Sequence, residues 1–140
     1  MNPNLIFIPV LIHMLLIFAL FIKLGQAKSK ALSLGEVNHK ETALNTKAWP
    51  DYVVKVSNNI ANQFESPILF YLLSLIFYLT NNVNATIMSL MSLYVASRYL
   101  HSYFHVTSNY VPLRFKSFLV GVLTLLGLTI WLLMLIIQSL

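Results

Sequence analysis

Three polar residues of the second apolar region share one helical face that could bind a small molecule. Asn58, Asn62 and Glu65 are spaced i, i+4 and i+7, so their side chains project from the same side of a helix. An uninterrupted apolar run follows Glu65, which places this carboxylate at or just inside the end of a membrane span. Ionisable residues in that position indicate a functional site, because their burial is costly.

A second polar stripe is expected on the next helix. Arg98, His101 and His105 are separated by three and four residues and therefore lie on one face. Burying an arginine in a bilayer costs at least about 2.5 kcal/mol, so Arg98 requires a partner. We predict that the two helices are neighbours and that Glu65 interacts with Arg98. The alternative is a buried ion pair that only fixes the helix register.

Arg114 lies in the opening turn of the last helix, where a cation opposes the helix dipole. An excess of positive charge on the cytoplasmic side would explain this position, as it does for Lys116. The functional interpretation is that Arg114 and the free N–H groups of the helix end attract an anion.

The paired histidines also allow a metal site to be considered. His101 and His105 at i, i+4 could bind a metal ion with Glu65 as a third ligand. We expect no metal, because Arg98 one turn away disfavours a second cation. His13, alone in the first helix, is expected to be a hydrogen-bonded packing residue.

The elements that position these residues are expected to be membrane helices. The chain of 140 residues is 58% hydrophobic and 9% charged, whereas soluble domains carry about 25% charged residues. Asn81-Asn82-Val83-Asn84 predicts a turn, and Pro67 should kink the helix that contains it. We therefore predict an all-α membrane protein, a single domain over residues 1–140 with helices near 4–25, 50–80, 84–108 and 112–138.

The distribution of basic residues predicts the orientation. Lysines gather in the loop of residues 26–49, and the third loop region carries Arg114 and Lys116, so both loops are expected in the cytoplasm and both termini on the opposite side. Nucleic acid is not an expected partner, because acidic residues dilute the lysines and no recognition module accompanies them. The chain has no cysteine, which excludes a cysteine nucleophile.

Several separated motifs resemble one family of membrane proteins. They are Asn62-Gln63-Phe64-Glu65-Ser66-Pro67, Arg98-x-x-His101, Pro112-x-Arg114 and Ser117-Phe118-x-Val120-Gly121. At this spacing they resemble the membrane-associated proteins in eicosanoid and glutathione metabolism, which include microsomal glutathione transferases and leukotriene and prostaglandin synthases.

The resemblance implies a four-helix bundle assembled as a homotrimer, with glutathione bound between subunits near the cytoplasmic interface. By resemblance, Arg114 stabilises the glutathione thiolate, and the residues that line the glutathione pocket are Asn62, Glu65, Arg98 and His101. The sequence also departs from the enzymatic members. Asn58 and Ala61 stand where a cation is common, and His105 replaces a tyrosine; we count Asn58 and His105 among the candidate glutathione-binding residues.

The leading hypothesis is a membrane-bound glutathione transferase, or peroxidase-like protein, that acts on lipophilic electrophiles arriving through the bilayer. The alternative is a non-catalytic protein of the same fold that binds a lipid or partner helices, which the missing cations favour. A small transporter or channel is a third class. It is disfavoured because one polar cluster near one interface does not form a polar path across the bilayer.

Overall fold

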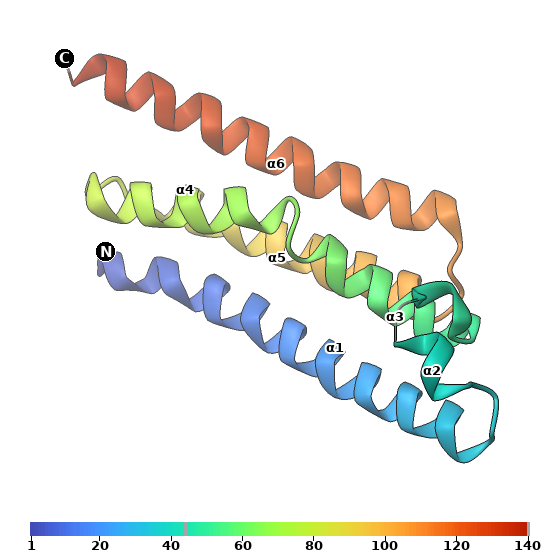
Figure 1. Cartoon of the computed structure of the whole chain (residues 1–140). Coiled ribbons are helices and arrows are strands. Elements are labelled where there is room, and N and C mark those ends of the chain that lie inside the picture. The colour runs from blue at the N-terminus through green and yellow to red at the C-terminus, as the bar shows by residue number, and fades with distance from the viewer. Residues whose placement is uncertain (44, 140) are drawn as a thin grey trace.

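The computed structural model describes residues 1–43 and 45–139, and every regular element in this part of the chain is helical. In chain order the elements are η1 (Pro3–Ile6), α1 (Phe7–Ser33), α2 (His39–Thr42), η2 (Thr46–Ala48), α3 (Asp51–Asn62), α4 (Pro67–Leu79), α5 (Ala85–Val106) and α6 (Val111–Gln138). Both termini and the α4–α5 turn lie at one end, and α2 lies at the other (Figure 1). The predicted all-helical class is confirmed.

The first helix is longer than the sequence analysis predicts. It continues past residue 25 to Ser33, and its last turns carry Lys28 and Lys30, which suit the negative end of a helix dipole. The helix ends where Gly35 adopts a φ of 67° and donates its N–H to the carbonyl of Leu32. A left-handed residue of this kind is a common helix terminator, and glycine adopts it without strain.

The helix predicted over residues 50–80 is divided in two. Pro67 is the first residue of α4, and because it has no N–H it cannot continue the hydrogen-bond ladder from α3. Gln63 and Phe64 instead close α3 with short turns, donating to the carbonyls of Ile60 and Ala61. The sequence analysis expected a kink inside one helix, and this is corrected: α3 ends at Asn62 and Pro67 begins a new helix.

The turn predicted at residues 81–84 is present between α4 and α5. Asn81 takes a left-handed φ of 55° just after α4, and Asn84 caps α5 by accepting a hydrogen bond from the Ile87 N–H at 3.0 Å. Asparagine is favoured at both kinds of position, because it tolerates left-handed backbone and caps helix ends.

The interior changes in character along the length of the molecule. Towards the termini, α4, α5 and α6 pack an apolar core. At the level of the α3–α4 break the buried side chains are polar instead. They are His13, Asn59, Gln63, Arg98, His101, Ser102 and His105.

Helices α5 and α6 lie close together at Gly121. A Cβ atom at this position would lie 2.8 Å from the Oγ of Ser97 and 3.4 Å from the ring of Tyr94. The glycine that the sequence motif contains therefore has a packing role, since it lets α6 lie against α5.

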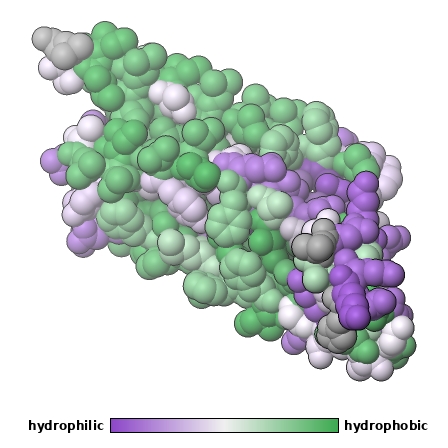
Figure 2. Space-filling view, viewed as in Figure 1, coloured by the Kyte–Doolittle hydropathy of each residue, from purple (hydrophilic) through white to green (hydrophobic). Residues whose placement is uncertain are grey.

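The face shown in Figure 2 is largely apolar, and its most extensive hydrophilic area lies at the end that carries α2. Three helical segments of the described chain are long and apolar enough to cross a membrane: Pro3–Ser33, Asp51–Leu79 and Val111–Gln138. Helix α5 is not one of these three segments. It packs beside α6, α1 and α3 (Figure 1). Large exposed apolar side chains on the other helices suit contact with lipid.

Candidate functional site

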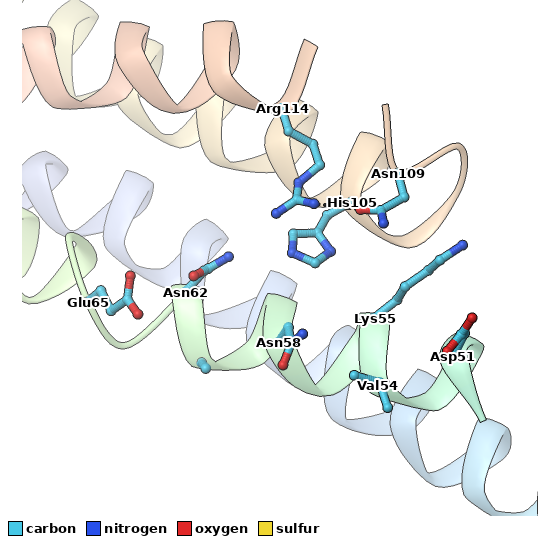
Figure 3. A pocket seen from close by; sticks show the side chains of 10 residues that line it. Asp51, Val54, Lys55, Asn58, Asn62, Glu65, His105, Asn109 and Arg114 are labelled. Carbon is cyan, nitrogen blue, oxygen red and sulfur yellow. Dashed lines mark hydrogen bonds between the residues drawn. The ribbon is translucent and has the colours of Figure 1, made fainter. Parts of the chain in front are cut away.

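A polar pocket of about 540 Å³ opens between α3, the end of α5 and the start of α6 (Figure 3). We call it the candidate pocket. It is lined by Asp51, Val54, Lys55, Asn58, Ala61, Asn62, Glu65, His105, Asn109 and Arg114. Five of the seven residues proposed from the sequence therefore meet here; Arg98 and His101 do not line this pocket.

One wall of the pocket is a single face of α3. Asn58 and Asn62 project from this face, as their spacing predicts, and Glu65 reaches the same pocket from the turn between α3 and α4 (Figure 3). Asp51 and Lys55, which the sequence analysis did not single out, extend the same face towards the start of the helix. The sequence spacing could have predicted both residues, because positions 51, 55, 58 and 62 are separated by four, three and four residues and so lie on one helical face.

Arg114 forms the opposite wall and is anchored by the loop before α6. Its Nη1 donates a hydrogen bond to the Oδ1 of Asn109 at 2.6 Å. Asn109 adopts a left-handed φ of 52° in the short connection between α5 and α6. The Nε of Arg114 is buried without a hydrogen-bond partner among the described residues. The guanidinium is therefore held at one corner and points towards the pocket and His105 (Figure 3).

The two helices are neighbours as predicted, but Arg98 and Glu65 form no direct ion pair within the described part of the chain. Arg98 is 1% exposed, and its guanidinium donates to the carbonyl of Asn62 at 2.8 Å and to the Oε1 of Gln63 at 3.2 and 3.3 Å. Glu65 is exposed at the pocket and attracts Arg98 only through space. The helix break contributes to the difference, because it frees the backbone carbonyl of Asn62, while Gln63 continues the buried face of α3 that carries Val56 and Asn59.

Gln63 is the centre of a buried hydrogen-bond network. Its Oε1 accepts from the Nε2 of His13 at 3.1 Å, and its Nε2 donates to the Oδ1 of Asn59 at 3.0 Å. An amide oxygen only accepts, so the Nε2 of His13 carries the proton and its Nδ1 accepts from the Tyr71 hydroxyl at 2.7 Å. The expectation that His13 is a hydrogen-bonded packing residue is confirmed. This network joins α1, α3, α4 and α5 directly behind the candidate pocket.

His101 lies on the other side of Arg114. Its Nδ1 donates to the backbone carbonyl of Arg114 at 3.0 Å, because a carbonyl oxygen accepts only. In the neutral ring the Nε2 is then an acceptor, and it is buried without a hydrogen-bond partner among the described residues. His101 lines a second space of about 210 Å³, here called the apolar cavity. It is completed by Val111, Arg114, Phe115 and Phe118.

The two histidines of the α5 stripe therefore face different spaces. His105 lines the candidate pocket, and the ring centroids of His101 and His105 are 5.8 Å apart. Within the described residues, no three histidine, aspartate or glutamate side chains are grouped as metal ligands would be.

The arrangement can separate polar and apolar ligands on either side of one cation. Arg114 lines both the candidate pocket, which is rich in amides and charges, and the apolar cavity, which is walled by aromatic rings. An anion beside its guanidinium would thus have polar partners on one side and an apolar space on the other.

Comparison with known proteins assigns the chain to a family. No curated protein and no solved structure matches the chain. A family model, described as the MAPEG family, matches residues 6–134, which include every residue that lines the candidate pocket. The chain therefore belongs to the MAPEG family, the membrane proteins whose motifs its sequence resembles.

Proposed function

We propose that this protein is a membrane-bound glutathione transferase, in which Arg114 stabilises the glutathione thiolate for attack on lipophilic electrophiles. A peroxidase activity would use the same thiolate. The observation that carries this proposal is the position of Arg114, anchored by Asn109 between a polar pocket and an apolar cavity. Membership of the MAPEG family supports it.

Glutathione suits the composition of the candidate pocket. The tripeptide carries two carboxylates, an ammonium group, two amides and a thiol. Lys55 and Arg114 supply cations for carboxylates, and Asn58 and Asn62 supply amide groups that donate and accept. Asp51 and Glu65 can receive the ammonium group. The volume of about 540 Å³ lies within the usual range for small-molecule sites, roughly 300–1,000 Å³.

The chemistry depends on ionising a thiol. A free thiol with a pKa near about 8.5 is mostly protonated at neutral pH, and the thiolate is the nucleophile. A fixed guanidinium beside the sulfur lowers the free energy of the anion and increases the ionised fraction. The thiolate then attacks an electrophilic carbon, and the electron pair of the bond that breaks leaves with the leaving group or with an epoxide oxygen.

We infer that α5 is a fourth membrane-spanning helix and that the chain forms a homotrimer. The position of α5 beside α6, α1 and α3 supports the first point, and family membership supports the second. The lysine-rich segment between α1 and α3 would face the cytoplasm, with both termini on the opposite side. Glutathione would then enter from the cytoplasm and the electrophile from the bilayer.

The alternative is a non-catalytic binding protein of the same family. Asn58 and Ala61 provide no cation at the wall of the pocket. Arg98, which we expected to bind glutathione, uses its hydrogen bonds on Gln63 and Asn62. A protein that binds a lipid in this pocket would show saturable binding but no turnover.

The first experiment is an ultraviolet difference spectrum of purified protein with glutathione, which reports the thiolate directly. The chain has no cysteine, so any thiolate signal belongs to the ligand. We expect a saturable signal in the wild type and its loss in Arg114→Ala, with Lys116→Ala unchanged as the matched control. A folded wild-type protein that gives no thiolate signal would reject the transferase and favour the non-catalytic alternative.

A further inference from the structure

A second polar space adjoins the candidate pocket along α3. Its volume is about 290 Å³, and it lies between the last turns of α1, the segment around η2, and α3. We call it the lysine cavity. It is lined by Lys28, Thr46, Lys47, Trp49, Val54, Ser57 and Asn58. Val54 and Asn58 line both spaces, so α3 separates two polar cavities.

The two cavities differ in charge. The candidate pocket contains two carboxylates, Asp51 and Glu65, which suit a ligand with an ammonium group. The described residues that line the lysine cavity include two lysines, two hydroxyls and one amide, but no carboxylate. A space with cations and neutral hydrogen-bond donors, and no acid to balance them, suits an anion.

The walls of the lysine cavity are held in place. The ammonium group of Lys28 lies 5.0 Å from the centroid of the Trp49 ring, a cation–π contact that orients both side chains. The backbone N–H of Lys47 donates to the Oδ1 of Asn45 at 3.0 Å, which fixes the turn that carries it. Glu36, an acid of the same connecting region, accepts a hydrogen bond from Tyr52 at 2.6 Å.

The position of the lysine cavity suggests the source of the anion. It lies where α1 and α3 leave the apolar surface and enter the hydrophilic end of the molecule (Figure 2). Lipid phosphates lie at that depth, where tryptophan is also enriched. Lysines beside a membrane surface attract anionic lipids with about 1 kcal/mol each.

We propose that the lysine cavity binds a phosphate group, carried either by the headgroup of an anionic phospholipid or by a free phosphate. Lys28 and Lys47 supply the charge, and Thr46, Ser57 and Asn58 supply neutral hydrogen bonds. Because Asn58 and Val54 also line the candidate pocket, an occupied lysine cavity would support the wall of α3 from behind. The proposal does not depend on glutathione chemistry.

Trp49 gives a direct optical report of this cavity. The chain has two tryptophans, so Trp131→Phe leaves Trp49 as the single emitter. The detergent-solubilised Trp131→Phe protein is titrated with short-chain phosphatidylglycerol, short-chain phosphatidylcholine, inorganic phosphate or glutathione. We expect a saturable change in Trp49 emission with phosphatidylglycerol, with inorganic phosphate, or with both, and its absence when Trp49 is also replaced by Phe.

Two double variants with the same loss of charge test the lysines. Lys28→Gln with Lys47→Gln removes both cations from the lysine cavity. Lys30→Gln with Lys40→Gln removes two nearby cations that do not line it. We expect the first pair to raise the titrant concentration at the midpoint roughly thirtyfold and the second pair to change it less than about threefold. Midpoints are compared rather than intensities, because Lys28 lies over the Trp49 ring.

The arms of the titration separate the possible sources and the possible failures. A response to phosphatidylglycerol without one to inorganic phosphate identifies a lipid headgroup, and the reverse identifies a soluble phosphate. The proposal is overturned if neither probe gives a saturable change, or if both double variants weaken the response equally. It is also overturned if glutathione alone produces the response, which would make the lysine cavity part of a peptide site.

Discussion

The guanidinium of Arg98 and the amide oxygen of Gln63 meet in the interior at 3.2 and 3.3 Å, where a carboxylate was expected. The carbonyl of Asn62 supplies the other acceptor at 2.8 Å. A buried arginine is therefore satisfied by two neutral oxygens at the α3–α4 break. This contact fixes the backbone of Asn62, whose side chain lines the candidate pocket.

Removing the Gln63 amide should destabilise the protein strongly. Gln63→Leu leaves the His13 Nε2 without its acceptor and the buried charge of Arg98 with the Asn62 carbonyl alone, and we expect a loss of about 3 kcal/mol. Gln63→Glu keeps the acceptor for Arg98 but replaces the amide that donates to Asn59 and Ser102 with a second acceptor, so it should retain only part of the stability. Thermal unfolding in detergent, followed by circular dichroism, compares the variants. Equal melting of Gln63→Leu and wild type would show that the network does not stabilise the break.

Asn109 should be required for full thiolate formation because it anchors Arg114. Asn109→Gly removes the 2.6 Å hydrogen bond but tolerates the left-handed backbone, so the fold should persist. We expect about tenfold weaker thiolate formation, from the loss of one charge-assisted hydrogen bond. Asn81→Gly is the matched control, since Asn81 also has a left-handed φ but lies in the α4–α5 turn. A thiolate signal in Asn109→Gly equal to that of the wild type would contradict the anchoring role.

Lys55 should contribute to glutathione affinity through its charge. It lines the candidate pocket at its outer end, and Lys55→Gln should raise the glutathione dissociation constant by about threefold to tenfold at low salt. The difference should shrink as salt is added, because screening weakens exposed charges. Lys116→Gln, outside the pocket, serves as the control in the same calorimetric titration. A salt-independent effect would indicate a packing role for Lys55 instead.

Gly121 should be required for the α5–α6 contact. Gly121→Ala would place a Cβ 2.8 Å from the Oγ of Ser97, and we expect a destabilisation of about 1–3 kcal/mol. Gly127→Ala, in the same helix with no atom within 4 Å of the added Cβ, should be neutral or stabilising by up to about 1 kcal/mol. The double variant Gly121→Ala with Ser97→Ala should recover part of the loss in the same thermal assay. Equal melting of the two alanine variants would exclude a close approach at Gly121.

The helical face of α3 could be predicted from the sequence because spacing alone determines it. Asn58 and Asn62 meet in the pocket for that reason, and the same rule applied further towards the N-terminus would have found Asp51 and Lys55. Glu65 follows the end of α3 and reaches the pocket from the turn before α4. Asn109 could not be found in this way. It lies in an irregular loop, where no period relates it to Arg114.

The partner of Arg98 could not be predicted because periodicity assumes a continuous helix. Pro67 indicated a distortion, but the sequence does not state that the break leaves the Asn62 carbonyl free for Arg98. Gln63 lies inward because it continues the spacing of the buried Val56 and Asn59, and Glu65 stays at the surface. His101 likewise shares a stripe with His105, yet its hydrogen bond to the Arg114 carbonyl turns it towards the apolar cavity.

The neutral coordination of Arg98 has a consequence for how the chain enters the membrane. Helix α5 is long enough to span but is not among the segments apolar enough to do so, and it carries this arginine. Its acceptors, Gln63 and the Asn62 carbonyl, belong to the segment that is synthesised just before it. We therefore expect α5 to insert not independently but as the second arm of a hairpin with α4, folded at Asn81–Asn84, so that the charge meets its acceptors during insertion.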